Sequence, residues 1–133
     1  MKLSIAIPTC ESKGRGVEFL DDLFRTIEIQ TFKDFEVVVS DHSKDDKLVD
    51  VIEEFQHKFN VTYVKNKNDF GNGPANTNNA IKNCSGDIIK VMFQDDFFYD
   101  DEALQKIYDS FDDQHDWLVC GSNHTQDDGH TFY

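Results

Sequence analysis

Cysteine and basic residues are scarce in this sequence, and each shortage excludes a class of protein. The three cysteines, Cys10, Cys84 and Cys120, are too few and too far apart for a disulfide framework or a metal-type spacing. Lys and Arg number 13 against 26 Asp and Glu, so the formal net charge is −13. General binding to nucleic acid or to an anionic membrane needs clustered cations, and this composition argues against both.

Apolar runs that could cross a membrane are also missing, and Pro8 breaks the apolar start too early for a signal peptide. Together with the few cysteines, this favours a reducing, cytoplasmic location. Neither G-x-x-x-x-G-K-S/T nor G-x-G-x-x-G occurs, so the common NTPase loop and the dinucleotide fingerprint are absent. No Ser-His-Asp or Cys-His arrangement can be argued from the positions of these residues.

What the chain does have is enough apolar material for one core. Of its 133 residues, 38% are hydrophobic and 12 are Phe, which suits one compact domain. We expect residues 1–122 to form that domain and residues 123–133 to form a polar C-terminal tail.

Short, continuous apolar runs typical of strands alternate along the chain with segments whose apolar residues recur at helical spacing. This alternation predicts an α/β fold. Such an order favours a single, mostly parallel sheet with helices on both faces. Asp45 and Asp46 are expected to cap or charge the start of the second helix. The predicted strands are 3–7, 35–40, 61–64, 88–93 and 117–121, and the predicted helices are 17–30, 45–59, 74–83 and 101–111.

The stretch 86–96 is the most informative part of the sequence. Gly86 is placed to end the preceding helix, and residues 88–93 are apolar except for Lys90, which predicts a strand covered on both faces. Asp95 and Asp96 follow directly, where an open parallel sheet binds ligands. Two adjacent carboxylates repel, and a hard cation such as Mn²⁺ or Mg²⁺ would stabilise them. The alternative interpretation is a solvated acidic turn.

Two other predicted strands also end in polar groups. Thr9 and Glu11 follow the first strand, and Asp41 follows the second. The Asp41 carboxylate could accept hydrogen bonds from a base N–H or a ribose hydroxyl. It could equally cap the turn Asp-His-Ser that it begins.

A polar loop with two glycines, 68–74, precedes the third predicted helix. Glycine lets backbone N–H groups approach a ligand, and a helix N-terminus favours anions, so Gly73 is a candidate contact. Asn76, Asn78 and Asn79 then occupy the first turns of the helix, although Asn is a mediocre helix former. They are either an N-terminal cap cluster or hydrogen-bonding partners for sugar hydroxyls.

The C-terminal tail holds a second group of polar side chains. His124 and His130 lie near Asp127 and Asp128, and this group could supply a third metal ligand. The simpler interpretation is an unstructured polar tail.

Taken in order, these pieces resemble the nucleotide-binding half of family 2 glycosyltransferases, which have the GT-A fold. The resemblance covers nearly the whole chain up to about residue 121. Its matching segments are 5–12, 29–32, 35–41, 73–86 and 94–96, the last similar to the D-x-D metal motif.

The resemblance implies a nucleoside-diphosphate sugar donor, usually UDP-linked, with Mn²⁺ or Mg²⁺ as cofactor. Asp95 and Asp96 would hold the metal on the diphosphate, and Asp41 would contact the base. The nucleotide-sugar site that it implies comprises Pro8, Thr9, Glu11, Asp41, Gly73, Asn78, Gln94 and Asp95.

The sequence departs from the family pattern at three places. Phe93 occupies the position of the usual first Asp of the metal motif, and Thr77 replaces a common Arg. The acceptor-binding half, which follows in the family and supplies an acidic catalytic base, has no counterpart here beyond the tail. His124 and Asp128 are therefore the candidates for the base.

We therefore expect a metal-dependent glycosyltransferase that moves a sugar from a UDP-sugar to an unknown hydroxyl acceptor. One alternative is a non-catalytic nucleotide-sugar-binding module that needs a partner chain or a second copy of itself. Another is a nucleotidyltransferase, although no Arg- or Lys-rich triphosphate loop is visible.

Overall fold

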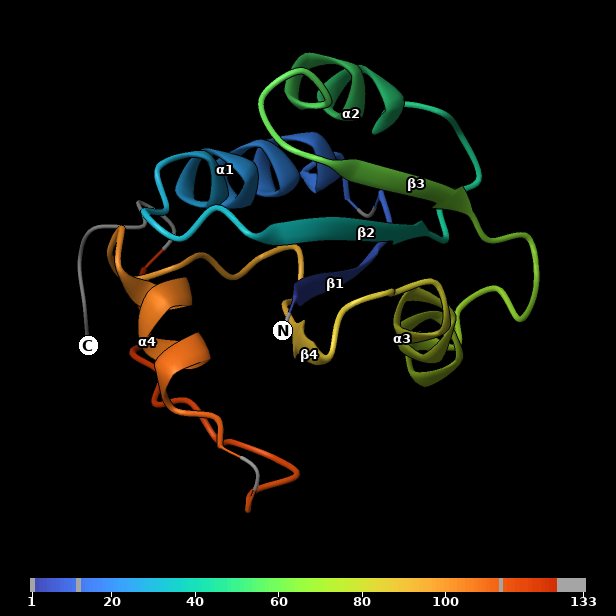
Figure 1. The fold of residues 1–133 in the computed structure, drawn as a ribbon. Coiled ribbons are helices and arrows are strands. Elements are labelled where there is room, and N and C mark those ends of the chain that lie inside the picture. Colours follow the sequence, from blue (N-terminus) through green and yellow to red (C-terminus); the bar gives the residue numbers. More distant parts are fainter. Residues whose placement is uncertain (1, 12, 113, 127–133) are drawn as a thin grey trace.

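A computed structural model describes residues 2–11, 13–112 and 114–126 of the chain. Four parallel strands form one sheet in the order β3-β2-β1-β4, with helices on both faces (Figure 1). The predicted α/β fold with a parallel sheet is confirmed. The elements in chain order are β1 (Leu3–Thr9), α1 (Gly16–Glu28), β2 (Phe35–Asp41), α2 (Val49–Phe55), β3 (Val61–Lys65), α3 (Gly73–Lys82), β4 (Ile88–Val91) and α4 (Ala103–Asp109).

The main core lies between the sheet and the helices α1 and α2. Alternate residues of β1 face it, and α1 meets them with a stripe of buried residues at helical spacing. Phe24 of α1 packs edge-to-face on Phe55 of α2, with ring centroids 5.3 Å apart. Helix α3 covers the opposite face (Figure 1), where Ser4 and Ala6 of β1 are small enough for close approach.

Two predicted strand features are wrong. Residues 117–121 form no strand: Trp117 and Val119 are each 75% exposed. The stretch 88–93 is not covered on both faces, because β4 is an edge strand of four residues and leaves Ile89 and Phe93 exposed. Residues 117–121 are apolar enough for a strand, but a strand also needs a neighbour to pair with. β4 has a neighbour on one side only, β1, and therefore stays at the edge of the sheet.

Helix starts differ from the prediction at α2 and agree with it at α3. Helix α2 begins only at Val49, without a side-chain cap, and the Asp46 carboxylate instead pairs with Lys65 at 3.3 Å. At α3, Asn72 accepts a hydrogen bond from the Ala75 N–H at 3.0 Å, and a proline follows in the first turn. Within the described ranges, no helix is both long and apolar enough to cross a membrane.

Gly86 has a different role from the one that the sequence suggested. Helix α3 already ends at Lys82, so Gly86 does not terminate it. A Cβ atom at position 86 would instead lie 2.6 Å from Ser4 Oγ and 2.7 Å from the Lys2 carbonyl oxygen. The glycine therefore allows the chain entering β4 to press against β1, and its N–H donates to Ser4 Oγ at 2.8 Å.

Replacing Gly86 with Ala should lower the free energy of unfolding by about 1–3 kcal/mol, the usual cost of overpacking a tight site. Gly121→Ala is the matched control, since a Cβ atom there meets nothing within 4 Å; its effect should stay within about 0.5 kcal/mol. Urea denaturation of the two variants measures the difference. Equal stabilities would contradict the close approach at Gly86.

Candidate functional site

Four side chains form a row across the carboxyl ends of the strands. The strand register places Thr9 opposite Asp41, and Asp41 opposite Lys65. Ala6 pairs with Val91, and the same register continued three residues further brings Gln94 to Thr9. Residues distant in the sequence are therefore held side by side at the edge where parallel sheets bind ligands.

Gln94 joins the end of β4 to the end of β1 through its side-chain amide. The Thr9 hydroxyl and the Cys10 N–H both donate to Gln94 Oε1, the latter at 2.9 Å. Gln94 Nε2 donates back to the Cys10 carbonyl oxygen at 2.9 Å. The amide thus extends the β1–β4 pairing beyond the last backbone bond and fixes where the next residues, Asp95 and Asp96, begin. The contact of Gln94 with a nucleotide remains a prediction.

Asp41 is fully buried, and both of its carboxylate oxygens are engaged. Oδ1 accepts from the Ser43 N–H at 2.8 Å, so the turn-capping interpretation is confirmed. Oδ2 accepts from the Tyr63 hydroxyl at 2.7 Å and from Lys65 Nζ at 3.2 Å. Sequence reasoning missed Tyr63 and Lys65, although their alternate positions on one strand place both on one face beside Asp41.

Asp41 raises the pKa of both of these partners. Burial and the hydrogen bond to Asp41 raise the pKa of Tyr63 above its ordinary value. Burial alone would lower the pKa of Lys65, but the hydrogen bond to Asp41 and the charge of Asp46 outweigh it and raise the pKa. At neutral pH the site therefore holds a neutral phenol and a charged ammonium against the Asp41 carboxyl group.

Asn76 of α3 is the central hydrogen-bonding residue below this row. Its Oδ1 accepts from Ser40 Oγ at 2.7 Å and from Asn66 Nδ2 at 3.1 Å. Its Nδ2 donates to the carbonyl oxygens of Ser40 at 2.9 Å and of Thr9 at 3.3 Å. One buried amide thus connects the ends of β1 and β2, and the residue after β3, to the helix on the other face.

The other Asn residues of α3 differ in their orientation. Asn79 also contacts the strand ends, because its Nδ2 donates to Ser40 Oγ at 2.8 Å. Asn78, the position that the resemblance selected, is exposed. The sequence signal for Asn76 is its spacing of three from Asn79, which puts both on one helical face. Gly73, also selected, is exposed at the first position of the helix.

Asn76→Ala should lower the free energy of unfolding by about 2–4 kcal/mol, because buried groups on three strand ends lose their partner. Asn78→Ala is the control on the same helix and should change stability by about 0.5 kcal/mol or less, since Asn78 is exposed. Thermal and urea unfolding measure both. A loss in Asn76→Ala no larger than in Asn78→Ala would contradict the role of this amide.

The loop between β3 and α3 folds back over the residue after Asp41. His42 is buried, its Nε2 lies 2.5 Å from the Asn68 carbonyl oxygen, and its ring stacks on Phe70 at 5.4 Å. Asp69 and Gly71 both adopt left-handed backbone conformations, which make the reversal. The loop therefore has a defined path beside the row, and half of the Phe70 side chain is left open to solvent.

The three residues predicted at the end of β1 are mostly covered. Pro8 is buried within the strand, and Thr9 is 2% exposed. The Glu11 N–H donates to Ser43 Oγ at 2.6 Å, and its carboxylate lies against Gly16, where a Cβ atom would be 2.7 Å from Oε2. Neither buried Glu11 carboxylate oxygen has a hydrogen-bond partner among the described residues. The N-terminus of α1 is a favourable neighbour for this charge.

Asp95 and Asp96 lie at the exit of β4, and both are exposed. Partial burial and the charge of Asp95 raise the pKa of Asp96, whereas Lys90 and His124 oppose the rise. Two adjacent carboxylates with free access fit a hard divalent cation. No group of three or more ligand-type side chains gathers in the described part of the chain. The protein would therefore supply these two carboxylates, and the remaining ligands would be substrate oxygens or water.

Of the two predicted catalytic candidates, the structure describes His124 but not Asp128. His124 lines a cavity together with Asp95 and Asp96. Asp128 lies outside the described residues, as do Asp127 and His130. The boundary of the tail at residue 123 stays a prediction.

The sequence matches a known family along almost its whole length. Residues 4–133 match the model described as "Glycosyl transferase family 2". The chain is 33% identical, over 97 residues, to the GalNAc(5)-diNAcBac-PP-undecaprenol beta-1,3-glucosyltransferase of Campylobacter jejuni, covering 71% of this chain and 30% of that protein. It is 30% identical, over 109 residues, to the poly(ribitol-phosphate) beta-glucosyltransferase of Bacillus spizizenii, covering 81% of this chain and 17% of that protein.

Solved structures that resemble this chain also belong to a glycosyltransferase, S. aureus TarS. A fragment of S. aureus TarS in complex with UDP superposes with a TM-score of 0.72 at 25% identity, over 82% of this chain and 31% of that one. The complex with UDP-GlcNAc gives the same TM-score and identity over 30% of its chain. The present chain thus spans less than a third of each of these three relatives.

Proposed function

Because the chain belongs to glycosyl transferase family 2, we propose that it binds a UDP-sugar and takes part in transferring the sugar to a hydroxyl acceptor. The observation that carries this proposal is the row Gln94–Thr9–Asp41–Lys65, with two exposed carboxylates next to it, at the carboxyl edge of a parallel sheet. Similar structures that contain UDP and UDP-GlcNAc support the choice of donor.

The nucleoside would lie over the β1 and β2 side of the row. Asp41 is held in one orientation by Ser43, Tyr63 and Lys65, so its carboxylate is preorganised and needs little further ordering when a ligand arrives. The exposed face of Phe70 and the start of α3 at Gly73 border the same side. A helix N-terminus there favours the negative charge of a diphosphate.

The diphosphate would extend toward Asp95 and Asp96. A divalent cation, Mn²⁺ or Mg²⁺, held by these two carboxylates would offset the charge of the departing diphosphate. Gln94 holds the two carboxylates close to the end of β1 through its paired hydrogen bonds to Cys10. In this arrangement, Asp95 and Asp96 orient the leaving group, while Thr9 and Asp41 orient the nucleoside.

A nucleotide-sugar-binding module that needs a partner chain is the second candidate. The chain spans less than a third of the relatives that it matches, so their transfer activity does not come to it by similarity alone. Donor turnover separates the two candidates: the enzyme should release UDP from a UDP-sugar when an acceptor is present, whereas the module alone should bind the donor without turnover.

Calorimetric titration of UDP into the chain, with and without Mn²⁺, tests the proposal. We expect metal-dependent binding in the micromolar to millimolar range, which corresponds to about −8 to −4 kcal/mol. Absence of binding to the folded protein in both conditions would overturn the proposal and return the carboxylate pair to an acidic turn.

A further inference from the structure

The loop between β3 and α3 holds an aromatic ring open to solvent, next to the β2 part of the row. Phe70 is 50% exposed, and one side of its ring stacks on His42, with the ring centroids 5.4 Å and the ring planes 25° apart. His42 is buried and is itself held by the end of β1, because its backbone N–H donates to the Thr9 carbonyl oxygen at 2.9 Å. The Phe70 ring is therefore supported from one side and open on the other.

The backbone on both sides of Phe70 follows a defined path. Asp69 and Gly71, its two neighbours, have positive φ angles of 53° and 81°. Few residues other than glycine adopt such angles, so the chain turns sharply before and after the ring. The Asn72 N–H closes this turn by donating to the Asp69 carbonyl oxygen at 2.9 Å. A ring presented from such a turn needs little further ordering when a ligand packs against it.

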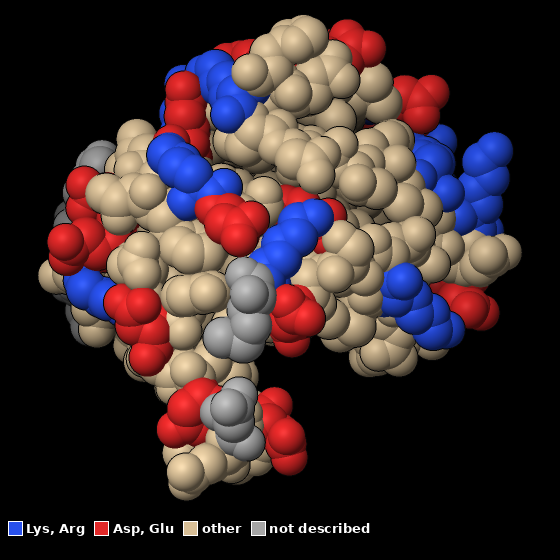
Figure 2. Space-filling model, in the orientation of Figure 1, with Lys and Arg blue, Asp and Glu red and all other residues tan. Residues whose placement is uncertain are grey.

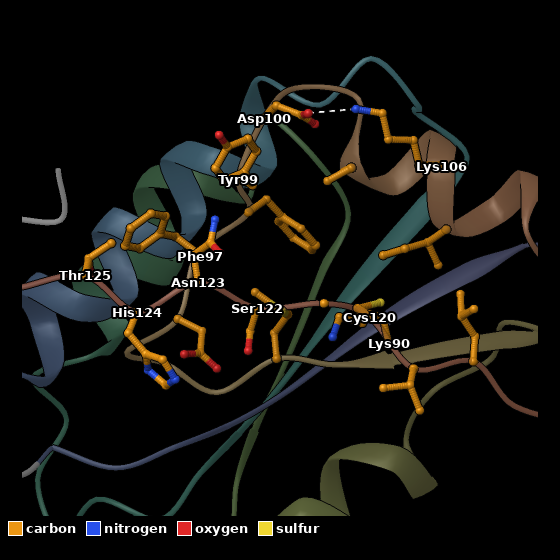
Figure 3. A pocket seen from close by; sticks show the side chains of 18 of the residues that line it. Lys90, Phe97, Tyr99, Asp100, Lys106, Cys120, Ser122, Asn123, His124 and Thr125 are labelled. Carbon is orange, nitrogen blue, oxygen red and sulfur yellow. Dashed lines mark hydrogen bonds and ion pairs between the residues drawn. The ribbon is translucent and has the colours of Figure 1, made fainter. Parts of the chain in front are cut away.

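The position of Phe70 relative to the carboxylate pair suits the length of a nucleotide. Asp95 and Asp96 lie toward the other end of the row, where they line the cavity that Figure 3 shows. β1 lies between β2 and β4 in the sheet, so two strand spacings of about 4.8 Å separate the ends of β2 and β4 by about 10 Å. A ribose and a diphosphate can bridge such a distance. A base against Phe70 would therefore leave its phosphates within reach of a cation held by the pair.

The side chains around this loop also suit an anionic ligand. Lys44 follows His42 by two residues, Lys67 precedes Phe70 by three, and both lysines are exposed. The loop lies at the right of the molecule in Figure 1, and Figure 2 shows Lys and Arg side chains on both sides of it. Although the whole chain has a formal net charge of −13, a nucleoside diphosphate would therefore meet cations at this end.

We propose that the open face of Phe70 stacks on the nucleobase of the sugar donor, with the His42 ring as its support. The identification of the ligand as a nucleotide rests on the proposed function. Every base has a flat face that can stack on an aromatic ring, so Phe70 contributes affinity without choosing between bases. The choice between bases then depends on directional hydrogen-bonding groups such as the Asp41 carboxylate.

The test is calorimetric titration of UDP, and separately of pyrophosphate, into the full chain with Mn²⁺. Pyrophosphate is the control ligand, since it offers two phosphates without a base. Phe70→Ala removes the ring, Phe70→Leu keeps apolar bulk without a flat aromatic face, and Phe70→Tyr keeps the ring. Trp117→Ala is the control variant, because it removes an aromatic side chain that is 75% exposed and lies outside the row.

We expect the affinity for UDP to fall about tenfold or more in Phe70→Ala and Phe70→Leu, since losing an aromatic partner of a base commonly costs about 5- to 150-fold. Phe70→Tyr and Trp117→Ala should stay within about twofold of wild type, and pyrophosphate should bind every variant equally. Wild-type UDP affinity in Phe70→Ala or in Phe70→Leu, or an equal loss of pyrophosphate affinity in Phe70→Ala, overturns this inference and leaves the proposed function in place. Absence of UDP binding to the wild type instead overturns the proposed function, and this inference with it.

Discussion

Asp96→Asn is expected to remove metal-dependent UDP binding, with a loss of at least about 100-fold in affinity in the presence of Mn²⁺. Groups that only hydrogen-bond to a metal ligand are worth about 10- to 100-fold in metal affinity, so a direct ligand should count for more. Asn keeps the size and one carbonyl oxygen of Asp96 but removes the negative charge that attracts the cation. Asp95→Asn should have an effect of similar size, because the two carboxylates are adjacent and both exposed.

The measurement is calorimetry of UDP with and without Mn²⁺ on wild type and the two variants. Asp109→Asn is the control, since this exposed carboxylate at the end of α4 binds Gln105 within its own helix. It removes the same charge from the chain without touching the pair. Equal Mn²⁺ dependence in Asp96→Asn, Asp95→Asn and Asp109→Asn would mean that the pair does not hold the metal.

Glu36→Gln is expected to lower the free energy of unfolding by about 3 kcal/mol at neutral pH. Glu36 is 5% exposed and accepts hydrogen bonds from Lys2 Nζ at 2.8 Å and from the Ser85 N–H at 2.6 Å, with further donors in the Ser4 and Ser85 hydroxyls. Burial alone would raise its pKa, but these donors outweigh burial and lower the pKa from 4.5 to about 2. A shift of this size corresponds to about 3 kcal/mol.

The same shift fixes the direction of the pH dependence. A carboxyl group whose pKa is lower in the folded state stabilises the fold fully above its unfolded pKa, here 4.5, and loses that contribution as the pH falls toward about 2. The stability difference between wild type and Glu36→Gln should therefore be largest at neutral pH and clearly smaller at about pH 3. Urea denaturation at the two pH values measures it.

Glu53→Gln supplies the matched control, because Glu53 is exposed on α2. This variant should differ from wild type by about 0.5 kcal/mol or less at either pH. If the difference between wild type and Glu36→Gln stayed constant with pH, ionisation of Glu36 would not be the source of its contribution.

The sheet and the carboxyl-end location of the site could be predicted because they depend on local patterns. Apolar periodicity found β1, β2, β3 and α1, and the polar residues that follow each strand identified Asp41 and Asp95 as strand-end groups. Parallel strands bring such groups to one edge regardless of how the side chains pack. That inference needs only the order of the elements.

The errors concern features that depend on neighbours. The run Trp117–Val119 has the composition of a strand, but composition cannot supply the adjacent strand that would complete a ladder. The sequence did not single out Asn76 as the buried amide, because a motif position does not specify which helical face meets the sheet, and the contact of the exposed Asn78 with a nucleotide sugar stays a prediction. Gly86 looked like a helix breaker, since the sequence cannot show that β1 lies 2.6–2.9 Å from its missing Cβ atom.

The strand order β3-β2-β1-β4 also determines the order in which the chain can fold during synthesis. β1 and β2 pair about 32 residues apart in the sequence (Leu3 with Phe35), whereas β1 and β4 pair about 85 residues apart (Leu3 with Ile88). One edge of β1 therefore stays unpaired until β4 has left the ribosome. An open apolar edge invites pairing with other nascent chains. Forming β4 therefore both places the carboxylate pair at its end and closes that edge of β1. A chain that stopped before residue 88 would lack the pair and would be prone to aggregate.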